Sequence, residues 1–248
     1  MKIIINRLVT NLLNFLPPEV AHRLLMNLLK ISPIKVKNIP DDERLKLNFC
    51  NIKLPHPVGL AAGFDKNAEV IDSLFALGFS FIEVGAVTPN PQKGNKKPRV
   101  FRLKKDLAII NRLGFNNRGM QYVCRKIKTY KGNGKIGINI GANKNSPDRI
   151  SDFIKVSTHS AASVDFITIN VSSPNTVGLR NLQHFHELSR LVQNIMQNEV
   201  VIEHKKPIFI KVAPDLNNQE LKSIVKVCKK YKISGIIATN TTIQRPHF

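Results

Sequence analysis

The sequence predicts an α/β fold, a (β/α)8 TIM barrel of which about six of the eight βα units are present, preceded by an amphipathic helical hairpin. From Leu54 onward, short apolar runs rich in Val, Ile and Ala alternate with amphipathic stretches, as buried parallel strands and their covering helices do. A polar residue able to bind a ligand ends nearly every run, and a barrel builds its active site from those strand ends. An open doubly wound sheet would concentrate such residues near one switch point, and no GxGxxG follows the first strand. We therefore favour the barrel.

The first 31 residues differ from the rest of the chain. Residues 1–16 and 20–31 place Leu and Ile near helical spacing with Lys and Arg between them, and Pro17-Pro18 separates the two stretches. Two compatible interpretations are open: an amphipathic pair lying on a membrane surface, and a helix pair docked on the main domain. Asn and Arg interrupt the apolar stretch, so we expect no cleavable signal peptide. We divide the chain into an N-terminal segment, residues 1–40, and a barrel domain, residues 41–248.

The elements of the barrel follow from the alternation of apolar runs and amphipathic stretches. Strands are predicted at residues 58–63, 81–87, 136–140, 166–171, 208–213 and 235–240. Helices are predicted at residues 67–77, 116–128, 146–162, 182–203 and 218–231.

Composition narrows the class of protein. The chain has 248 residues, 42% of them hydrophobic, which is ordinary for a globular domain. Its formal charge of +21 suits anionic partners, yet the basic residues are scattered without a recognisable nucleic-acid module, so we expect no nucleic-acid partner. Cys50, Cys124 and Cys228 show no CxxC pairing, which argues against disulfides and structural zinc, and we expect no metal.

The most informative segment is NVSSPNTVGLR, residues 170–180, directly behind the apolar run at 166–169. Two Asn, two Ser and a Thr at a strand end present directional donors and acceptors, but no tight metal ligand and no strong base. That chemistry suits a flat polar ligand. Taken alone, the segment also fits a strand-end turn that uses Ser, Pro, Asn and Gly for its geometry.

Six motifs, in this order, resemble those of the dihydroorotate dehydrogenases over about residues 54–245. They are AAGFDK at 61–66, NRLGFNN at 111–117, GINIG at 137–141, NVSSPN at 170–175, KVAPD at 211–215 and ATNTT at 238–242. Each motif alone is weak, but chance agreement of all six is very improbable.

The resemblance implies a reaction and a branch of the family. These enzymes oxidise dihydroorotate to orotate for pyrimidine biosynthesis, passing a C5 proton to a base and the C6 hydride to flavin mononucleotide (FMN). Soluble forms use Cys as the base, whereas quinone-linked, membrane-associated forms use Ser, and Ser173 stands at that position. The resemblance points to Phe115 and Thr176 as its catalytic neighbours. A hydroxyl is a poor base in water, so such a site must exclude solvent.

The resemblance also assigns binding roles. The expected substrate-binding residues are Lys66, Asn111, Arg112, Leu113, Gly114, Phe115, Asn170, Asn175, Asn240 and Thr241. The expected FMN-binding residues are Ala62, Gly63, Phe64, Asp65, Lys66, Ala86, Asn139, Asn170, Lys211 and Thr239. Lys211 would lie by the N1 and O2 region of the flavin, where a cation stabilises the reduced anion.

The N-terminal segment fits the quinone-linked branch, in which a helix pair forms the mouth of a quinone tunnel. His22, in AHRL at 21–24, and Arg102, in RVFRL at 99–103, would be the polar quinone contacts. We expect a monomeric peripheral membrane protein on an anionic membrane surface, at the cytoplasmic face of the inner membrane if the source is bacterial.

Two departures from the family pattern bear on activity. Ala86 replaces a Thr or Ser that relatives often carry, which removes one possible hydroxyl contact to the flavin. Family members also continue with two further βα units whose loops hold the flavin phosphate, so we expect this span to bind FMN weakly. Two alternatives stay open: a truncated remnant that has lost activity, and an FMN barrel acting on tRNA, a dihydrouridine synthase.

Overall fold

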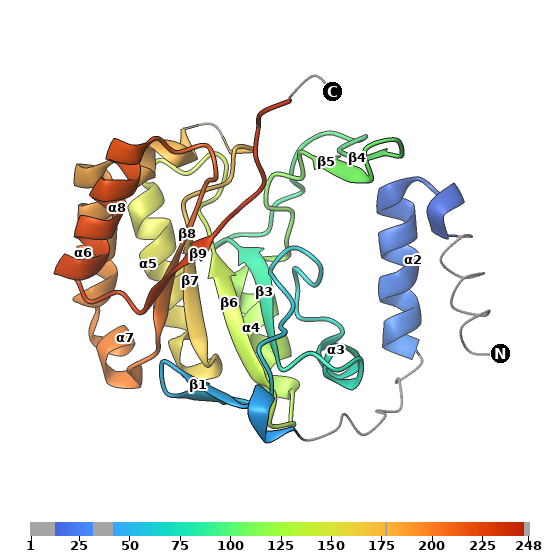
Figure 1. Cartoon of the computed structure of the whole chain (residues 1–248), viewed down its shortest axis with the longest axis horizontal. Coiled ribbons are helices and arrows are strands. Elements are labelled where there is room, and N and C mark those ends of the chain that lie inside the picture. The colour runs from blue at the N-terminus through green and yellow to red at the C-terminus, as the bar shows by residue number, and fades with distance from the viewer. Residues whose placement is uncertain (1–12, 32–41, 177, 246–248) are drawn as a thin grey trace.

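A parallel sheet of five strands forms the centre of the computed structural model, which describes residues 13–31, 42–176 and 178–245 (Figure 1). In sheet order the strands are β3 (Phe81–Val87), β6 (Lys135–Ile140), β7 (Phe166–Asn170), β8 (Ile208–Val212) and β9 (Gly235–Ala238). The register pairs Asn139 with Thr168, and Asn170 with Lys211. The polar residues at the carboxyl ends of neighbouring strands therefore lie side by side.

Helices join successive strands and cover the outer face of the sheet. They are α3 (Ile71–Ala76), α4 (Gly119–Thr129), α5 (Arg149–Ser160), α6 (Phe185–Met196), α7 (Glu199–His204) and α8 (Asn218–Lys230), with short 3-10 turns η1 (Glu43–Leu45), η2 (Ala161–Ser163) and η3 (Leu179–Gln183). Alternate strand residues such as Ile138, Ile169 and Ile210 are completely buried beneath these helices. The residues between them face the opposite side, because side chains alternate along a strand. This fold is the barrel-like α/β architecture that the sequence predicts.

An antiparallel hairpin of β1 (Leu47–Phe49) and β2 (Ile52–Leu54) lies at the amino-terminal end of the sheet (Figure 1). Ile52 and Leu54 pack against the inward-facing rings of Phe166 and Phe209. These two rings meet edge to face, with centroids 5.6 Å apart. The apolar cluster fills this end of the sheet, so the opposite end is the one left for a ligand.

Helix α2 (Pro18–Ile31) stands beyond α3, away from the sheet (Figure 1). Its Met26 and Leu29 join the main core, and Ser73 Oγ of α3 donates to the Leu29 carbonyl at 2.6 Å. The helix is therefore docked on the barrel. Of the predicted first helix, residues 13–15 are helical and residues 1–12 lie outside the described part, as does the predicted domain boundary at 40/41.

The predicted first strand, residues 58–63, is wrong as a full strand. Leu60 alone pairs with β3, its N–H donating to Phe81 O and its carbonyl accepting from Glu83 N. The chain then turns at Gly63, whose φ of +119° is unfavourable for other residues, so the ladder cannot continue. The hairpin of β4 (Val100–Leu103) and β5 (Ala108–Asn111) was not predicted.

Helix boundaries also differ from the prediction. The stretch 182–203 is not one helix, because Asn198 caps a new one: its side chain accepts from Val201 N, and α7 begins at Glu199. The stretch 67–77 becomes helical only at Ile71, because the Asp65 carboxylate holds the N–H groups of Asn67, Glu69 and Val70 in a loop. Helix α8 matches closely, and Asn217 and Glu220 form a capping box at its start.

Candidate active site

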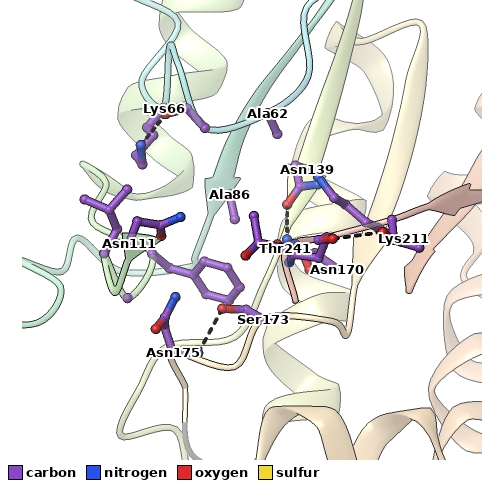
Figure 2. A pocket seen from close by; sticks show the side chains of 16 residues that line it. Ala62, Lys66, Ala86, Asn111, Asn139, Asn170, Ser173, Asn175, Lys211 and Thr241 are labelled. Atoms are coloured by element: carbon purple, nitrogen blue, oxygen red, sulfur yellow. Dashed lines mark hydrogen bonds between the residues drawn. The ribbon is translucent and has the colours of Figure 1, made fainter. Parts of the chain in front are cut away.

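A cavity of about 370 Å³ lies where β3, β6, β7, β8 and β9 end, and side chains converge on it from loops on both sides (Figure 2). Its lining residues are Ala62, Gly63, Lys66, Ala86, Asn111, Leu113, Gly114, Phe115, Asn139, Asn170, Ser173, Asn175, Lys211, Thr239, Asn240 and Thr241. The sequence predicted every one of these as a site residue. Their individual roles remain predictions.

Ser173 lies in the loop that follows β7 and is 4% exposed. Its Oγ accepts a hydrogen bond from Asn175 N at 3.3 Å, so the hydroxyl proton stays available (Figure 2). Thr176 is also buried, and its Oγ1 has no hydrogen-bond partner among the described residues. It does not line the cavity. The serine hydroxyl is thus screened from water and held by its own loop.

Two lysines bring positive charge to the cavity from opposite sides (Figure 2). Lys66 Nζ donates to the Gly63 carbonyl. Burial, together with the nearby Arg99 charge, lowers the pKa of Lys66 to about 8. The ammonium group of Lys211, near the end of β8, has no hydrogen-bond or ion-pair partner within the described ranges. Both ammonium groups can therefore bind an anionic or electron-rich ligand.

Small residues line one part of the cavity and leave room for a flat group. Ala62, Gly63 and Ala86 carry at most a methyl group there. A Cβ added at Gly63 would meet nothing within 4 Å, which indicates open space beside the backbone. Asn139 and Asn170 add polar amide groups to the cavity wall, and Asn170 Nδ2 donates to Asn139 Oδ1 at 2.8 Å (Figure 2). The cavity suits a planar, polar and partly anionic ligand.

A second cavity, of about 650 Å³, lies between α2 and the neighbouring part of the barrel. His22 lies in it, with Nε2 2.9 Å from the Phe64 carbonyl oxygen and its ring edge to face with Phe64. Burial lowers the pKa of His22, so the ring is neutral at neutral pH. Gly63, Lys66 and Leu113 line both cavities and form a shared wall.

Arg102 also lines the second cavity, and its guanidinium donates hydrogen bonds to backbone carbonyls of the N-terminal segment. It donates to the carbonyls of Leu16 at 2.6 Å, Leu13 at 3.3 Å and Asn14 at 3.4 Å. These are the last carbonyls of the helical segment before α2, which need a donor when the helix ends. Arg102 therefore fixes the bend between the two N-terminal helical segments.

Four predicted residues differ from expectation in placement. Phe64 and Asp65 line the second cavity instead of the first, and the Asp65 carboxylate is occupied by backbone N–H groups. Thr176 and Arg112 line neither. Arg112 donates to the Pro98 carbonyl at 2.9 Å and lies over the Phe101 ring, because the β4–β5 hairpin draws its side chain outward. Its predicted substrate contact is not supported by this placement.

Sequence reasoning missed two buried charged residues near the site. Glu83 is 6% exposed and accepts from Asn139, and Arg99 is 5% exposed and contacts α2. A signal existed for Glu83, since it interrupts an otherwise apolar strand. Arg99 had no comparable signal among the many basic residues of the chain.

The fold and the cavity define a barrel-like α/β protein with a pocket suited to a flat, partly anionic ligand at the carboxyl ends of its strands. The sequence profile of the dihydroorotate dehydrogenase family matches residues 44–248, and the chain belongs to that family. It is 45% identical over 240 residues to a dihydroorotate dehydrogenase (quinone) of Bradyrhizobium sp. (strain BTAi1), covering 95% of this chain and 66% of the relative. It is 46% identical over 244 residues to that of Mesorhizobium japonicum, covering 98% and 68%.

Solved structures agree with the family. The structure of DHODH from Eimeria tenella in complex with ferulenol matches with a TM-score of 0.84 and 37% identity, covering 92% of this chain and 68% of that one. The chain thus spans about two thirds of the length of the relatives it matches. No helix in the described ranges is long and apolar enough to cross a membrane.

Proposed function

We propose that this protein oxidises (S)-dihydroorotate to orotate, with FMN as hydride acceptor and a membrane quinone as final electron acceptor, as a step of pyrimidine biosynthesis. The observation that carries the proposal is the meeting of a buried Ser173, several asparagine amides and two lysines in one cavity of a family member. The printed names of its relatives support the same reaction.

The residues of the first cavity fit a flavin. Ala62, Gly63 and Ala86 leave space for a flat ring system, and the cavity volume of about 370 Å³ is within the range of small-molecule sites. Lys211 supplies a cation without a competing partner among the described residues, and Asn139 supplies an amide. When bound, FMN supplies hydride acceptance. Ala62, Gly63, Ala86, Asn139, Lys211 and Thr239 would hold it.

Ser173 would remove the C5 proton of dihydroorotate. Its burial excludes water, which a weak oxygen base needs, and the Asn175 N–H fixes the position of Oγ. Phe115 supplies an apolar ring to the same cavity. Lys66 would bind the substrate carboxylate, because its ammonium group lies at the cavity wall.

The asparagines would bind the pyrimidine ring. Asn111, Asn170, Asn175 and Asn240 all line the cavity, and each amide carries both donors and an acceptor. A pyrimidine dione alternates carbonyl oxygens with N–H groups around its ring, so planar amides complement it. The site would thereby fix substrate orientation before proton removal.

The second cavity would admit the quinone. It shares Gly63, Lys66 and Leu113 with the first cavity, so a ligand there would lie close to the flavin. His22 and Arg102 supply polar groups at its wall. The exposed side of α2 carries Val20, Leu24 and Leu28, an apolar stripe suited to a membrane surface and to peripheral attachment.

The tRNA-modifying alternative gains no support from the cysteines. Cys124 lies in α4 and Cys228 in α8, and neither lines either cavity. Burial raises the pKa of Cys124 to about 11. Neither thiol is placed to serve as an acid beside a flavin.

A spectroscopic experiment tests the proposal. The purified chain is reconstituted with FMN, and its absorbance is followed under anaerobic conditions while dihydroorotate is added. We expect the flavin band to bleach with dihydroorotate and to return when a lipophilic quinone is added. A bound flavin that dihydroorotate leaves oxidised would contradict the proposed substrate, and bleaching without return would contradict the quinone.

A further inference from the structure

A buried carboxylate, Glu83, ends a chain of side-chain hydrogen bonds that runs along the wall of the pocket. Its Oε1 accepts from Asn139 Nδ2 at 2.8 Å, and Asn139 Oδ1 accepts from Asn170 Nδ2 at 2.8 Å. Asn170 Oδ1 accepts from Ser172 Oγ at 2.8 Å, and Ser172 Oγ accepts from Asn240 Nδ2 at 2.9 Å. The chain therefore runs from β3 through β6 and β7 to the segment that follows β9.

Every bond in this chain points toward Glu83. Amides and hydroxyls can each donate or accept, so a row of them can be reversed by turning the groups. An ionised carboxylate only accepts, which forces the Asn139 N–H toward Glu83 and the Asn139 oxygen toward Asn170. This acceptor-only residue sets the direction of the bonds at its own end of the row, and the backbone N–H of Ser172, which donates to Asn170 Oδ1 at 3.2 Å, favours the same direction.

The direction decides what the asparagines offer to a ligand. Asn170 Oδ1 already accepts from both Oγ and N of Ser172, at 2.8 and 3.2 Å, so its lone pairs are used. Asn240 Oδ1 accepts from Thr241 N at 2.8 Å. Each of these amides lines the cavity and keeps one N–H that no bond within the described residues uses. This part of the wall therefore presents donors, which pair with carbonyl oxygens.

We infer that Glu83 is a positioning residue that fixes this polarity and makes the pocket select ring carbonyls over ring amino groups. The inference deepens the proposed function and rests on it for the identity of the ligand. Glu83 touches no ligand in this scheme, since it does not line the cavity. It acts through Asn139 and Asn170.

The test compares orotate with two analogues in which an amino group replaces the carbonyl oxygen at C4 or at C2. Dissociation constants are measured by calorimetry for the wild type and for Glu83→Gln. In the wild type we expect orotate to bind at least about 100-fold more tightly than the weaker analogue, because a donor facing a donor leaves both unpaired. In Glu83→Gln the bond to Asn139 can reverse, so residue 83 no longer holds Asn139 and Asn170 in this direction, and the ratio should narrow at least about tenfold. Equal weakening of all three ligands would indicate a purely structural role and overturn the inference.

Three further variants sharpen the result. Glu83→Asp keeps an acceptor-only group and should retain the wild-type ratio. Ser172→Ala frees a lone pair on Asn170 Oδ1 and should narrow the ratio, which keeps the test decisive if Glu83→Gln does not fold. Asp165→Asn removes a carboxylate that accepts from Lys135 Nζ and Ile136 N, outside the row, and should leave the ratio unchanged.

A measurement without ligand separates this inference from the proposed function. In the ligand-free wild type, the side-chain amide protons of Asn139 should show nuclear Overhauser contacts with the Cγ protons of Glu83. Their absence would overturn the inference whatever the ligand is. If they are present and the wild type does not bind orotate, the proposed function fails, while the polarity of the row stands.

Discussion

Arg99 of the barrel forms an ion pair with Glu19 of α2, with Nη2 2.6 Å from Oε1 and Nε 3.2 Å from both carboxylate oxygens. The same guanidinium donates through Nη1 to the Lys93 and Asn95 carbonyls. Asn95 in turn donates to the carbonyls of Arg112 and Asn175. Helix α2 is thus connected, through one buried arginine, to the loop that carries Ser173.

Replacing Arg99 should loosen α2 from the barrel. Arg99→Met leaves the Glu19 carboxylate with only the longer Lys97 contact, at 3.5 Å, and takes the donor from two carbonyls, so we expect a loss of about 3 kcal/mol in the free energy of unfolding. Glu19→Gln keeps the shape and should cost about 1 kcal/mol. Denaturant unfolding measures both values. A loss for Arg99→Met no greater than that for Glu19→Gln would show that the carbonyl contacts contribute nothing.

Acid should remove the Glu19 contribution. The hydrogen bond from Arg99 lowers the pKa of Glu19 below its unfolded value of 4.5. A lowered carboxyl pKa stabilises the fold above the unfolded pKa, and this stabilisation is lost as pH falls through the folded pKa. The stability difference between wild type and Glu19→Gln should therefore be constant near neutrality and shrink below about pH 4.5, as pH-dependent unfolding will show. A difference that persists at pH 2 would contradict this account.

Ser173→Ala should cut the rate of flavin reduction by dihydroorotate about 100-fold or more, the usual scale for loss of a general base, while orotate still binds. Stopped-flow absorbance measures the reduction, and calorimetry measures the binding. Ser173→Cys should keep partial activity with a changed pH profile, because a thiol ionises nearer neutrality. Near-full reduction in Ser173→Ala would remove Ser173 from the role of base.

Much of this pocket was predictable, because polar residues at strand ends of a parallel sheet must gather at one edge. Asn139, Asn170 and Lys211 each stand at the end of an apolar run, and the register brings them together. The full first strand was predicted wrongly because its apolar run continues past Leu60, although only this residue joins the ladder. The break between α6 and α7 at Asn198 could not be predicted for a similar reason, since the apolar spacing continues across it without Pro or Gly.

The hydrogen-bond partners of the buried charged residues could not be predicted from the sequence. Glu83 and Asn139 are 56 residues apart, and Arg99 and Glu19 are 80 apart. A pattern of residue types indicates that such groups are buried, but only the register of the sheet and the docking of α2 determine which atoms they meet. For the same reason Arg112 was placed in the pocket from its motif, although the hairpin turns its side chain away.

The pKa of Lys66, lowered to about 8, predicts a pH dependence for orotate binding. Below about pH 8 the ammonium group is charged and binds the carboxylate of the ligand. Above that pH it loses its proton, so the dissociation constant of orotate should rise about tenfold per pH unit. Lys66→Arg stays protonated and should show no such rise between pH 8 and 10. Calorimetry between pH 8 and 10 measures the dissociation constant of orotate. An unchanged dissociation constant in the wild type at pH 10 would exclude Lys66 as the residue that binds the carboxylate.

The stability of the ligand-free protein should change with pH in the opposite sense. The unfolded chain holds the Lys66 proton up to pH 10.5, whereas the folded protein releases it from about pH 8. Since the unfolded state then binds more protons, Lys66 makes the free energy of unfolding rise with pH between about 8 and 10.5. Lys66→Met should lack this component of the rise. Identical pH profiles for the two proteins would show that Lys66 is not perturbed.

The apolar stripe on α2 should attach the protein to membranes. Leu24 and Leu28 are 40% and 48% exposed, so replacing both by Gln removes apolar surface with little effect on the fold. Each buried leucine contributes roughly 1–2 kcal/mol to partitioning, so the double variant should bind vesicles containing anionic lipid at least about tenfold more weakly. Leu221→Gln on α8, where the side chain is 42% exposed, is the matched control and should bind as the wild type does. Vesicle co-sedimentation measures all three, and equal weakening by Leu221→Gln would show that the attachment is not specific to α2.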